Sequence, residues 1–186
     1  MKLVCLLEER SAEEVLKVIL PRILPQEVFF RTIAFEGKRD LADKLQRRIQ
    51  HWQGGEDVFL VLMDQDSTDC VAAKDGLVEI IKKTNKAERT LVRIACHELE
   101  NFFLGDLAAV EQGLGISGLS RQQNSRKYRV PDNLANAPDE LKRMTENKYS
   151  KISGSRSIAP FLKIDGSNRS TSFNNLVRGI KKLVEG

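Results

Sequence analysis

The chain has 186 residues, 41% of them hydrophobic and 30% charged, with a formal net charge of +4. This length suits one compact domain, and the composition is typical of a globular rather than a disordered protein. No run approaches the roughly 20 apolar residues that span a bilayer, and the apolar stretch at residues 3–7 is too short for a secretory signal, so we expect a cytoplasmic protein without a membrane partner.

The first half of the chain alternates between strand patterns and amphipathic helix patterns. Strands are expected at residues 2–7, 27–35, 57–63 and 90–96, where apolar and β-branched residues dominate. Helices are expected between them, at 39–52, at 68–83 and after a capping box formed by Ser11 and Glu14. This alternation indicates an α/β fold with a mostly parallel sheet, helices on both faces and right-handed crossovers.

The second half of the chain has a different pattern and a different charge. Helices are expected at 99–114, with an interruption near Gly105, and at 138–149 and 173–184, whereas residues 115–131 form a polar and basic loop. Residues 1–116 hold sixteen Lys and Arg against twenty Asp and Glu, and residues 117–186 hold fourteen against six. We therefore expect an α/β core at 1–116 and a basic C-terminal extension at 117–186 that packs on the same domain.

Acidic residues follow two of the expected strands directly. Glu8 comes after the first strand, and Asp64 and Asp66 come after the third. Because ligands of open α/β sheets collect at the carboxyl ends of the strands, neighbouring strands would bring these carboxylates together. Crowded acids repel one another, and oxygen ligands without His or Cys favour Mg²⁺ or Mn²⁺. Asp69 either extends this metal-binding set or lies in the first turn of the next helix.

A second acidic segment, His97-Glu98-Leu99-Glu100-Asn101, follows the fourth strand. It differs from a His-Glu-x-x-His zinc motif because Asn101 stands where the second His is required. Glu98 and Glu100 could complete the carboxylate cluster, but in an extended segment they point to opposite sides, so we expect one of them to contribute. A capped helix start is the alternative interpretation. Neither a Gly-x-Gly-x-x-Gly nor a Walker-type phosphate loop is present.

A strand that ends in Glu and a later strand that ends in Asp-x-Asp resemble the Toprim domain of topoisomerases, primases and overcoming-lysogenization-defect nucleases. The chain is also similar, over nearly its whole length, to a bacterial Toprim-like family that is catalogued mainly as a domain of unknown function. The segments that carry this similarity are Cys5-Leu6-Leu7-Glu8-Glu9, residues 64–70, residues 93–106, Tyr149-Ser150-Lys151 and Ser170-Thr171-Ser172-Phe173.

This resemblance implies roles for particular residues. Glu8 matches the Toprim glutamate, Asp64 and Asp66 match the metal-binding pair, Glu100 is a further acidic site residue, and Lys151 contacts a phosphate or the transition state. It also implies an ABC/AAA-type ATPase partner encoded nearby and a role in anti-phage defence. One position departs from the pattern, because Toprim glutamates are commonly followed by Gly and Glu9 stands here.

The expected function is metal-dependent hydrolysis of nucleic-acid phosphodiesters, since 186 residues leave no room for a topoisomerase's separate tyrosine domain. Glu8 could alternatively act as a general base. Phosphate contacts are expected from four residues of the basic loop, Arg121, Arg126, Lys127 and Arg129. Two alternatives stay open: a non-catalytic Toprim-like module that binds an ATPase and nucleic acid, which Glu9 favours, and a receiver-like phosphoacceptor domain.

Overall fold

A computed structural model of the chain describes residues 1–66 and 69–186. The strands are β1 (Lys2–Leu7), β2 (Phe29–Ala34), β3 (Val58–Asp64) and β4 (Thr90–Ala95). The helices are α1 (Arg10–Ile23), α2 (Lys38–Gln50), α3 (Cys70–Lys82), α4 (Asn101–Leu104), α5 (Leu107–Leu114), α6 (Ala137–Met144), α7 (Lys151–Ile158) and α8 (Thr171–Glu185). Short 3₁₀ helices lie at Ala87–Arg89, Ser120–Gln122, Pro131–Asn133 and Ala159–Phe161.

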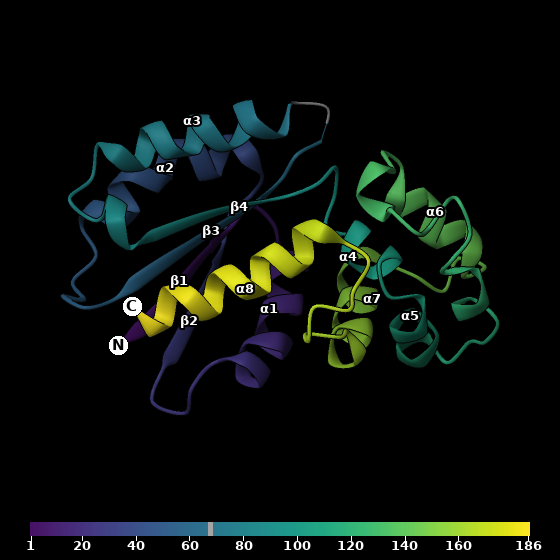
Figure 1. Cartoon of the computed structure of the whole chain (residues 1–186). Helices are drawn as coiled ribbons and strands as arrows, with labels where there is room; N and C mark the ends of the chain where they lie inside the picture. Colours follow the sequence, from purple (N-terminus) through teal and green to yellow (C-terminus); the bar gives the residue numbers. More distant parts are fainter. Residues whose placement is uncertain (67–68) are drawn as a thin grey trace.

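The four strands form one parallel sheet in the order β2-β1-β3-β4. Figure 1 shows α2 and α3 on one face of this sheet and α1 and α8 on the other. The predicted α/β fold with a parallel sheet is therefore confirmed, and the arrangement is Rossmann-like. Because β1 pairs directly with β3, the residues that follow these two strands meet at the same edge.

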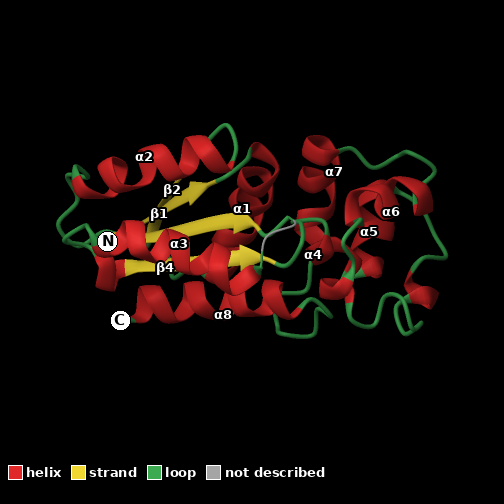
Figure 2. Cartoon of the chain, turned by 90° about the horizontal axis from the view of Figure 1, so that it is seen from above, coloured by secondary structure: helices red, strands yellow, loops and turns green. Residues whose placement is uncertain are grey.

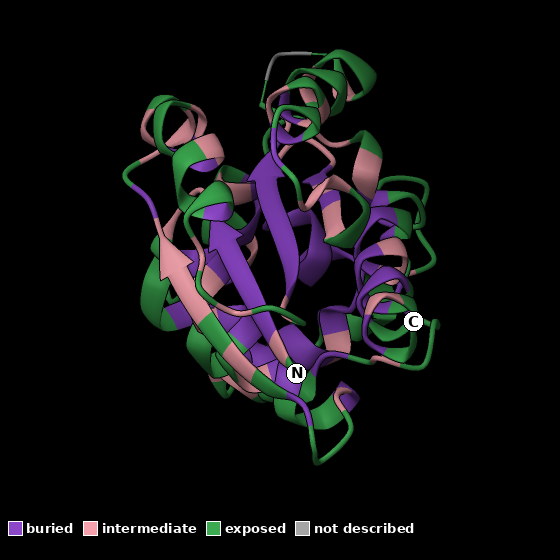
Figure 3. Cartoon of the chain, turned by 90° about the vertical axis from the view of Figure 1, so that its left-hand side faces the viewer, coloured by how far each residue is buried: buried purple, intermediate pink, exposed green. Residues whose placement is uncertain are grey.

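Side chains of the two central strands alternate between two apolar cores. In β1, Leu3, Cys5 and Leu7 join the core beneath α1 and α8, whereas Val4 and Leu6 join the core beneath α2 and α3. A strand covered on both faces must be apolar at every position, which explains the near-continuous runs in the sequence. Figure 3 shows the buried central strands beside the partly exposed edge strand β2.

The second half of the chain forms a helical layer beyond the carboxyl ends of the strands, built from α4 to α7 (Figure 2). The chain then returns along α8, which packs on β4. Helix α7 was not predicted, because its Ser- and Gly-containing sequence has no clear apolar stripe; it packs against α1 and α5. None of the helices in the described chain has the length and apolar composition that a membrane span requires.

The predicted capping box at the start of the first helix is wrong. Helix α1 begins at Arg10, so Glu9 takes the N-cap position, and Ser11 lies within the first turn. The Ser11 hydroxyl donates a hydrogen bond to the Glu9 carboxylate, and it accepts no backbone N–H of its own helix among the described residues. Glu14 forms an ion pair with Arg156 of α7. Ser11 thus contacts the residue before the helix, and Glu14 contacts α7.

Candidate metal centre

Glu8 and Asp64 lie side by side at the carboxyl edge of the sheet, as their places after β1 and β3 predict. The Asp64 backbone N–H donates to Oε2 of Glu8 at 2.9 Å. The Asp64 side chain points away from the sheet edge, and its Oδ2 accepts the Leu99 backbone N–H at 3.2 Å. One carboxylate is thus held by the backbone of its neighbour, and the other by the loop after β4.

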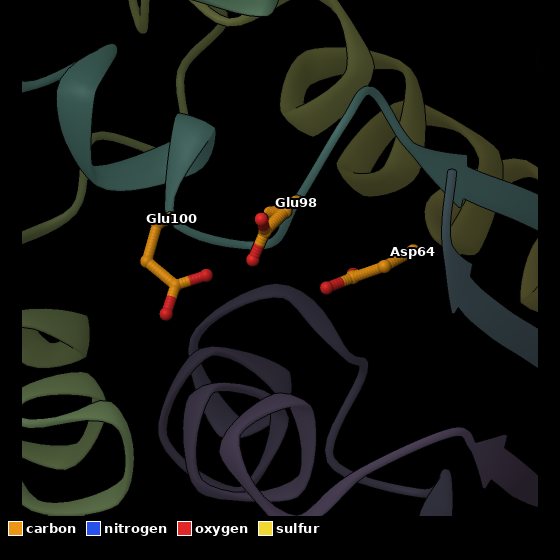
Figure 4. Close-up of side chains that lie close together, drawn as sticks. All are labelled: Asp64, Glu98 and Glu100. Atoms are coloured by element: carbon orange, nitrogen blue, oxygen red, sulfur yellow. The ribbon is translucent and has the colours of Figure 1, made fainter. Parts of the chain in front are cut away.

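Three carboxylates converge here, those of Asp64, Glu98 and Glu100. Each offers one oxygen, and these oxygens lie within 4.8 Å of one another. Figure 4 shows Asp64 reaching this point from the end of its strand and the two glutamates from the loop after β4. The expectation that only one of the two glutamates would contribute is wrong.

The segment that carries the two glutamates is not extended. His97 has a φ of 57°, a left-handed conformation that few residues other than Gly adopt, and it lies in the bend that follows β4. The Asp66 backbone N–H donates to the His97 carbonyl at 2.8 Å, which ties the loop after β3 to this bend. Leu99 and Glu100 then form a turn in which Glu100 has helical backbone angles and the Asn101 N–H donates to the Glu98 carbonyl at 3.1 Å. This turn lets two glutamates two positions apart face the same point.

Glu100 is the most deeply placed acid of the group, with no exposed surface. Its Oε1 accepts the Tyr149 hydroxyl at 2.9 Å. No group in the described chain donates to its Oε2, although that atom is fully buried. A buried carboxylate oxygen without a partner is costly, and a cation is the ligand that would satisfy it.

Burial and mutual repulsion disfavour ionisation of these acids in the absence of a cation. Burial, followed by the charges of Glu9, Glu100 and Glu8, raises the pKa of Asp64 well above its ordinary value. Burial likewise raises the pKa values of Glu8, Glu98 and Glu100. A divalent cation would reverse this effect, because it stabilises each carboxylate in its charged form.

A lysine from α7 lies beside the acids and is held by Glu9. Lys151 Nζ is 2.7 Å from Oε2 of Glu9. Partial burial disfavours the ammonium, but the Glu9 contact and the charges of Glu100 and Asp64 outweigh it and raise the pKa of Lys151 above its ordinary value. The ammonium is therefore a fixed positive charge at the edge of the acidic group, and its role in phosphate contact stays a prediction.

Asp66 and Asp69 lie outside the group of three. Asp66 is exposed, with a φ of 52°, and its Oδ2 is 2.8 Å from Nζ of Lys38. Asp69 is the N-cap of α3, where its Oδ1 accepts the backbone N–H groups of Val71 and Ala72, each at 3.0 Å. The helix-start interpretation thus describes the geometry of Asp69, and a ligand role for either aspartate stays a prediction.

The basic loop of the C-terminal part is anchored next to the acidic segment. Asn101, the neighbour of Glu100, donates through Nδ2 to the carbonyls of Pro131 at 2.6 Å and Leu134 at 2.9 Å. Before this anchor come the candidate nucleic-acid-binding residues Arg121, Arg126, Lys127 and Arg129, all exposed. Of these, Lys127 forms an ion pair at 2.7 Å with Glu140 of α6.

Glu140 joins the basic loop to α6. Its side chain is 3% exposed and accepts hydrogen bonds from Arg143, Lys127 and the Tyr128 hydroxyl. Burial opposes the charge, but these donors outweigh it and lower the pKa of Glu140 to about 2.

The donor set fits a hard divalent cation. All three ligand candidates supply carboxylate oxygens, and the group includes no His or Cys. Oxygen ligands of this kind suit Mg²⁺ or Mn²⁺, whereas zinc sites use imidazole and thiolate. Such an ion would also supply the partner that the buried Oε2 of Glu100 lacks among the described residues.

Sequence reasoning missed three contributions to this site. An extended segment allows only one of Glu98 and Glu100 to contribute, and the turn at residues 98–101 that brings both in has no recognisable sequence signal. Glu9 was noted only as a departure from the Toprim pattern, although its charge is, after burial, the largest contribution that raises the pKa of Asp64. The Tyr149–Glu100 hydrogen bond joins residues 49 positions apart, and no local pattern predicts it.

The family model for a domain of unknown function, DUF4276, matches residues 7–181. The chain therefore belongs to this family, and the matched segment includes every carboxylate described above. No curated protein and no solved structure is similar enough to the chain to match it.

Proposed function

We propose that this DUF4276 protein is a metal-dependent nuclease that hydrolyses nucleic-acid phosphodiesters with Mg²⁺ or Mn²⁺. The observation that carries the proposal is the group of three converging carboxylates with one buried, unpartnered oxygen at the carboxyl edge of a parallel sheet. This is the edge at which α/β proteins place their chemistry. The resemblance to Toprim domains supports the same reaction.

Asp64, Glu98 and Glu100 are the residues that would hold the cation, with Glu8 beside Asp64. Asp66 could join them only by leaving its ion pair with Lys38. When bound, a divalent cation polarises a phosphoryl oxygen and makes an attacking water more acidic. Glu8 has a raised pKa, and among the described residues only its Oε2 accepts a hydrogen bond, so its other oxygen is available to accept a proton.

Lys151 and the basic loop supply the positive charge that a polyanionic substrate needs. Lys151 stands at the edge of the carboxylate group, where its ammonium can pair with a phosphate oxygen. Arg121, Arg126 and Arg129 are exposed on the segment that Asn101 anchors beside Glu100. Contacts to phosphates through such residues are weakly sequence-specific and weaken as salt rises.

A Toprim relationship, an ABC/AAA-type ATPase partner and a role as effector of a defence system rest on the sequence resemblance. They belong to the proposal as its biological setting. Purification with the neighbouring ATPase, followed by the cleavage assay below, tests this setting directly.

The proposal is tested by incubating the protein, alone and with a partner ATPase, with plasmid, single-stranded DNA and RNA in Mg²⁺, Mn²⁺ or EDTA. We expect cleavage with either metal and none in EDTA. Asp64→Asn should reduce the rate by at least about a hundredfold, because it removes a charged ligand. Asp75→Asn, at an exposed position of α3, is the matched control and should cleave normally.

Two outcomes would contradict the proposal. Cleavage that survives Asp64→Asn would place the reaction elsewhere. Nucleic-acid binding without cleavage, under every metal and partner condition, would favour the non-catalytic module, for which the Glu9–Lys151 ion pair is the supporting observation. Labelling of Asp64 by acetyl phosphate would instead support the receiver-like alternative.

A further inference from the structure

A second charged site lies at the opposite edge of the sheet. A cavity of about 680 Å³ opens where β1, β2 and β3 begin, and its lining includes Lys2, Arg31, Arg47, Arg48, Trp52 and Asp57. Strands of six residues separate this edge from the carboxylates, or roughly 20 Å at about 3.3 Å per residue. The cavity and the candidate metal centre are therefore distinct sites.

The cations of this cavity come from three different elements. Lys2 begins β1, Arg31 belongs to the edge strand β2, and Arg47 and Arg48 lie in the last turn of α2. Within the chain that the structure describes, no carboxylate pairs with any of their side chains. Four unpaired cations around one cavity repel one another, and an anion would relieve that repulsion.

The one carboxylate that lines the cavity is already engaged. Asp57 accepts the Lys2 backbone N–H through Oδ1 at 2.8 Å and the Trp52 indole N–H through Oδ2 at 2.9 Å. Its role is to orient the indole. The backbone at Gly54 lies close to the Asp57–Trp52 hydrogen bond, and any larger residue would clash there, because a Cβ would lie 1.9 Å from Oδ2 of Asp57.

An aromatic surface accompanies the positive charge. The guanidinium carbon of Arg31 lies 5.6 Å from the centroid of the Trp52 ring, a cation–π contact that fixes the arginine. The negative end of α2 is occupied by Lys86, whose ammonium donates to the carbonyls of Ile49 and Trp52. The helix end thus presents cations to the cavity rather than free carbonyls.

We propose that this cavity binds a phosphate-bearing ligand of nucleotide size. Guanidinium groups bind phosphate oxygens in pairs, and aromatic rings and arginine planes stack on bases. The volume lies in the range of small-ligand sites and exceeds what a single phosphate fills. The proposal is independent of the nuclease function, because it uses none of the carboxylates.

Trp52 is the only tryptophan of the chain, so its fluorescence reports on this cavity alone. The whole protein is titrated in EDTA with inorganic phosphate, adenosine monophosphate and a single-stranded thymidine hexanucleotide, and emission is corrected for absorption. We expect a saturable change with the mononucleotide or the hexanucleotide, and a much weaker one with phosphate. Preference between the first two distinguishes a free nucleotide from one unit of a strand.

The double variant Arg31→Gln, Arg47→Gln should weaken binding at least tenfold and, for the hexanucleotide, flatten the dependence of log K on log salt, by about 0.7 for each lost phosphate contact. The matched control is Arg178→Gln, Lys181→Gln, which removes the same charge from exposed positions of α8. Circular dichroism checks the fold of each variant.

Three results would overturn the proposal. The first two are no fluorescence change at millimolar ligand and equal affinities in the two double variants. The third is displacement of the bound nucleotide by polyglutamate as effectively as by the hexanucleotide, which would show a general attraction for polyanions. Asp64→Asn should leave this titration unchanged. A failure here therefore leaves the nuclease proposal untouched, and a failure of cleavage leaves the cavity untouched.

Discussion

Replacement of Asp64 by Asn should stabilise the protein while it abolishes cation binding. Asp64 is 6% exposed and lies within 4.8 Å of two other carboxylate oxygens. Asn keeps the shape and the acceptor for the Leu99 backbone N–H but removes the charge. Without a cation, that charge is unfavourable, because burial and neighbouring acids raise the pKa of Asp64.

The magnitude follows from the spacing of the acids. Two unit charges 4.8 Å apart repel by roughly 3 kcal/mol at an effective dielectric constant of about 20. Proton uptake by the acids removes part of this repulsion, so we expect Asp64→Asn to gain about 1–3 kcal/mol at pH 8. For a domain of this size the gain corresponds to a melting temperature higher by about 3–9 °C.

The sign of the pH dependence follows from the raised pKa. Well below pH 3.8, the ordinary pKa of an aspartate, Asp64 is protonated in both the folded and the unfolded chain, so the Asn variant has no advantage there. As pH rises, the unfolded chain ionises freely and the folded chain does so at a cost, and the advantage grows. Melting curves in EDTA between pH 4 and pH 8 measure this difference, with Asp75→Asn as the control.

Mg²⁺ should reverse the ranking of the two proteins. At pH 8 and 10 mM Mg²⁺, the wild-type protein should melt at a higher temperature than in EDTA, because a ligand that binds only the folded state stabilises it. The Asn variant should show no such shift. If Asp64→Asn instead destabilises the protein equally at pH 4 and pH 8, Asp64 serves mainly to accept the Leu99 backbone N–H. That result would contradict a cation site built from mutually repelling carboxylates.

Three further changes test the surroundings of the site. Tyr149→Phe leaves both oxygens of Glu100 without a partner among the described residues, and it should lower the free energy of unfolding by about 1–3 kcal/mol at pH 8, measured by urea unfolding. The loss should shrink at lower pH as Glu100 is protonated. A loss of stability that does not change with pH would indicate a packing defect instead. Glu140→Gln should cost up to about 3 kcal/mol above pH 4.5, a loss that vanishes as pH falls toward the folded-state pKa of about 2, and an undiminished loss at pH 3 would contradict the assignment. Gly113→Ala places a Cβ of α5 2.6 Å from the backbone of Ile158 in α7 and should cost about 1–3 kcal/mol in the same assay. An unchanged midpoint of urea unfolding would show that α5 and α7 move apart easily.

The sheet could be predicted because its cause is local. Buried parallel strands need apolar residues on both faces, and residues 2–7 and 58–63 satisfy that rule in consecutive positions. Strand order follows less directly from the sequence. The acids at the ends of the first and third strands could form one site only if those strands were neighbours, and β1 does pair with β3. The helix α7 escaped prediction because its packing against α1 and α5 depends on small residues rather than on an apolar stripe.

The candidate site could be predicted in part, for the same physical reason. Asp64 follows a buried strand, so its place at the sheet edge is determined by the strand itself. Glu98 and Glu100 converge through a turn that follows a left-handed residue at His97, a conformation that sequence patterns do not specify for residues other than Gly. Contacts between distant segments, such as Tyr149 with Glu100, arise from the assembled fold and have no local signal.

Glu9 appeared to weigh against catalysis, because it adds a negative charge where Toprim domains commonly have Gly. In the folded chain this charge is paired with Lys151 at 2.7 Å, and Ser11 donates a hydrogen bond to the same carboxylate. The pair is partly exposed, with 45% of the lysine side chain and 25% of the glutamate side chain accessible. An ion pair of that kind contributes only about 0–1 kcal/mol, so a substrate phosphate can replace Glu9 as the partner of Lys151 at small cost. Under the proposed nuclease function, Glu9 would hold Lys151 at the site until a phosphate binds, and the departure from Gly is compatible with that proposal.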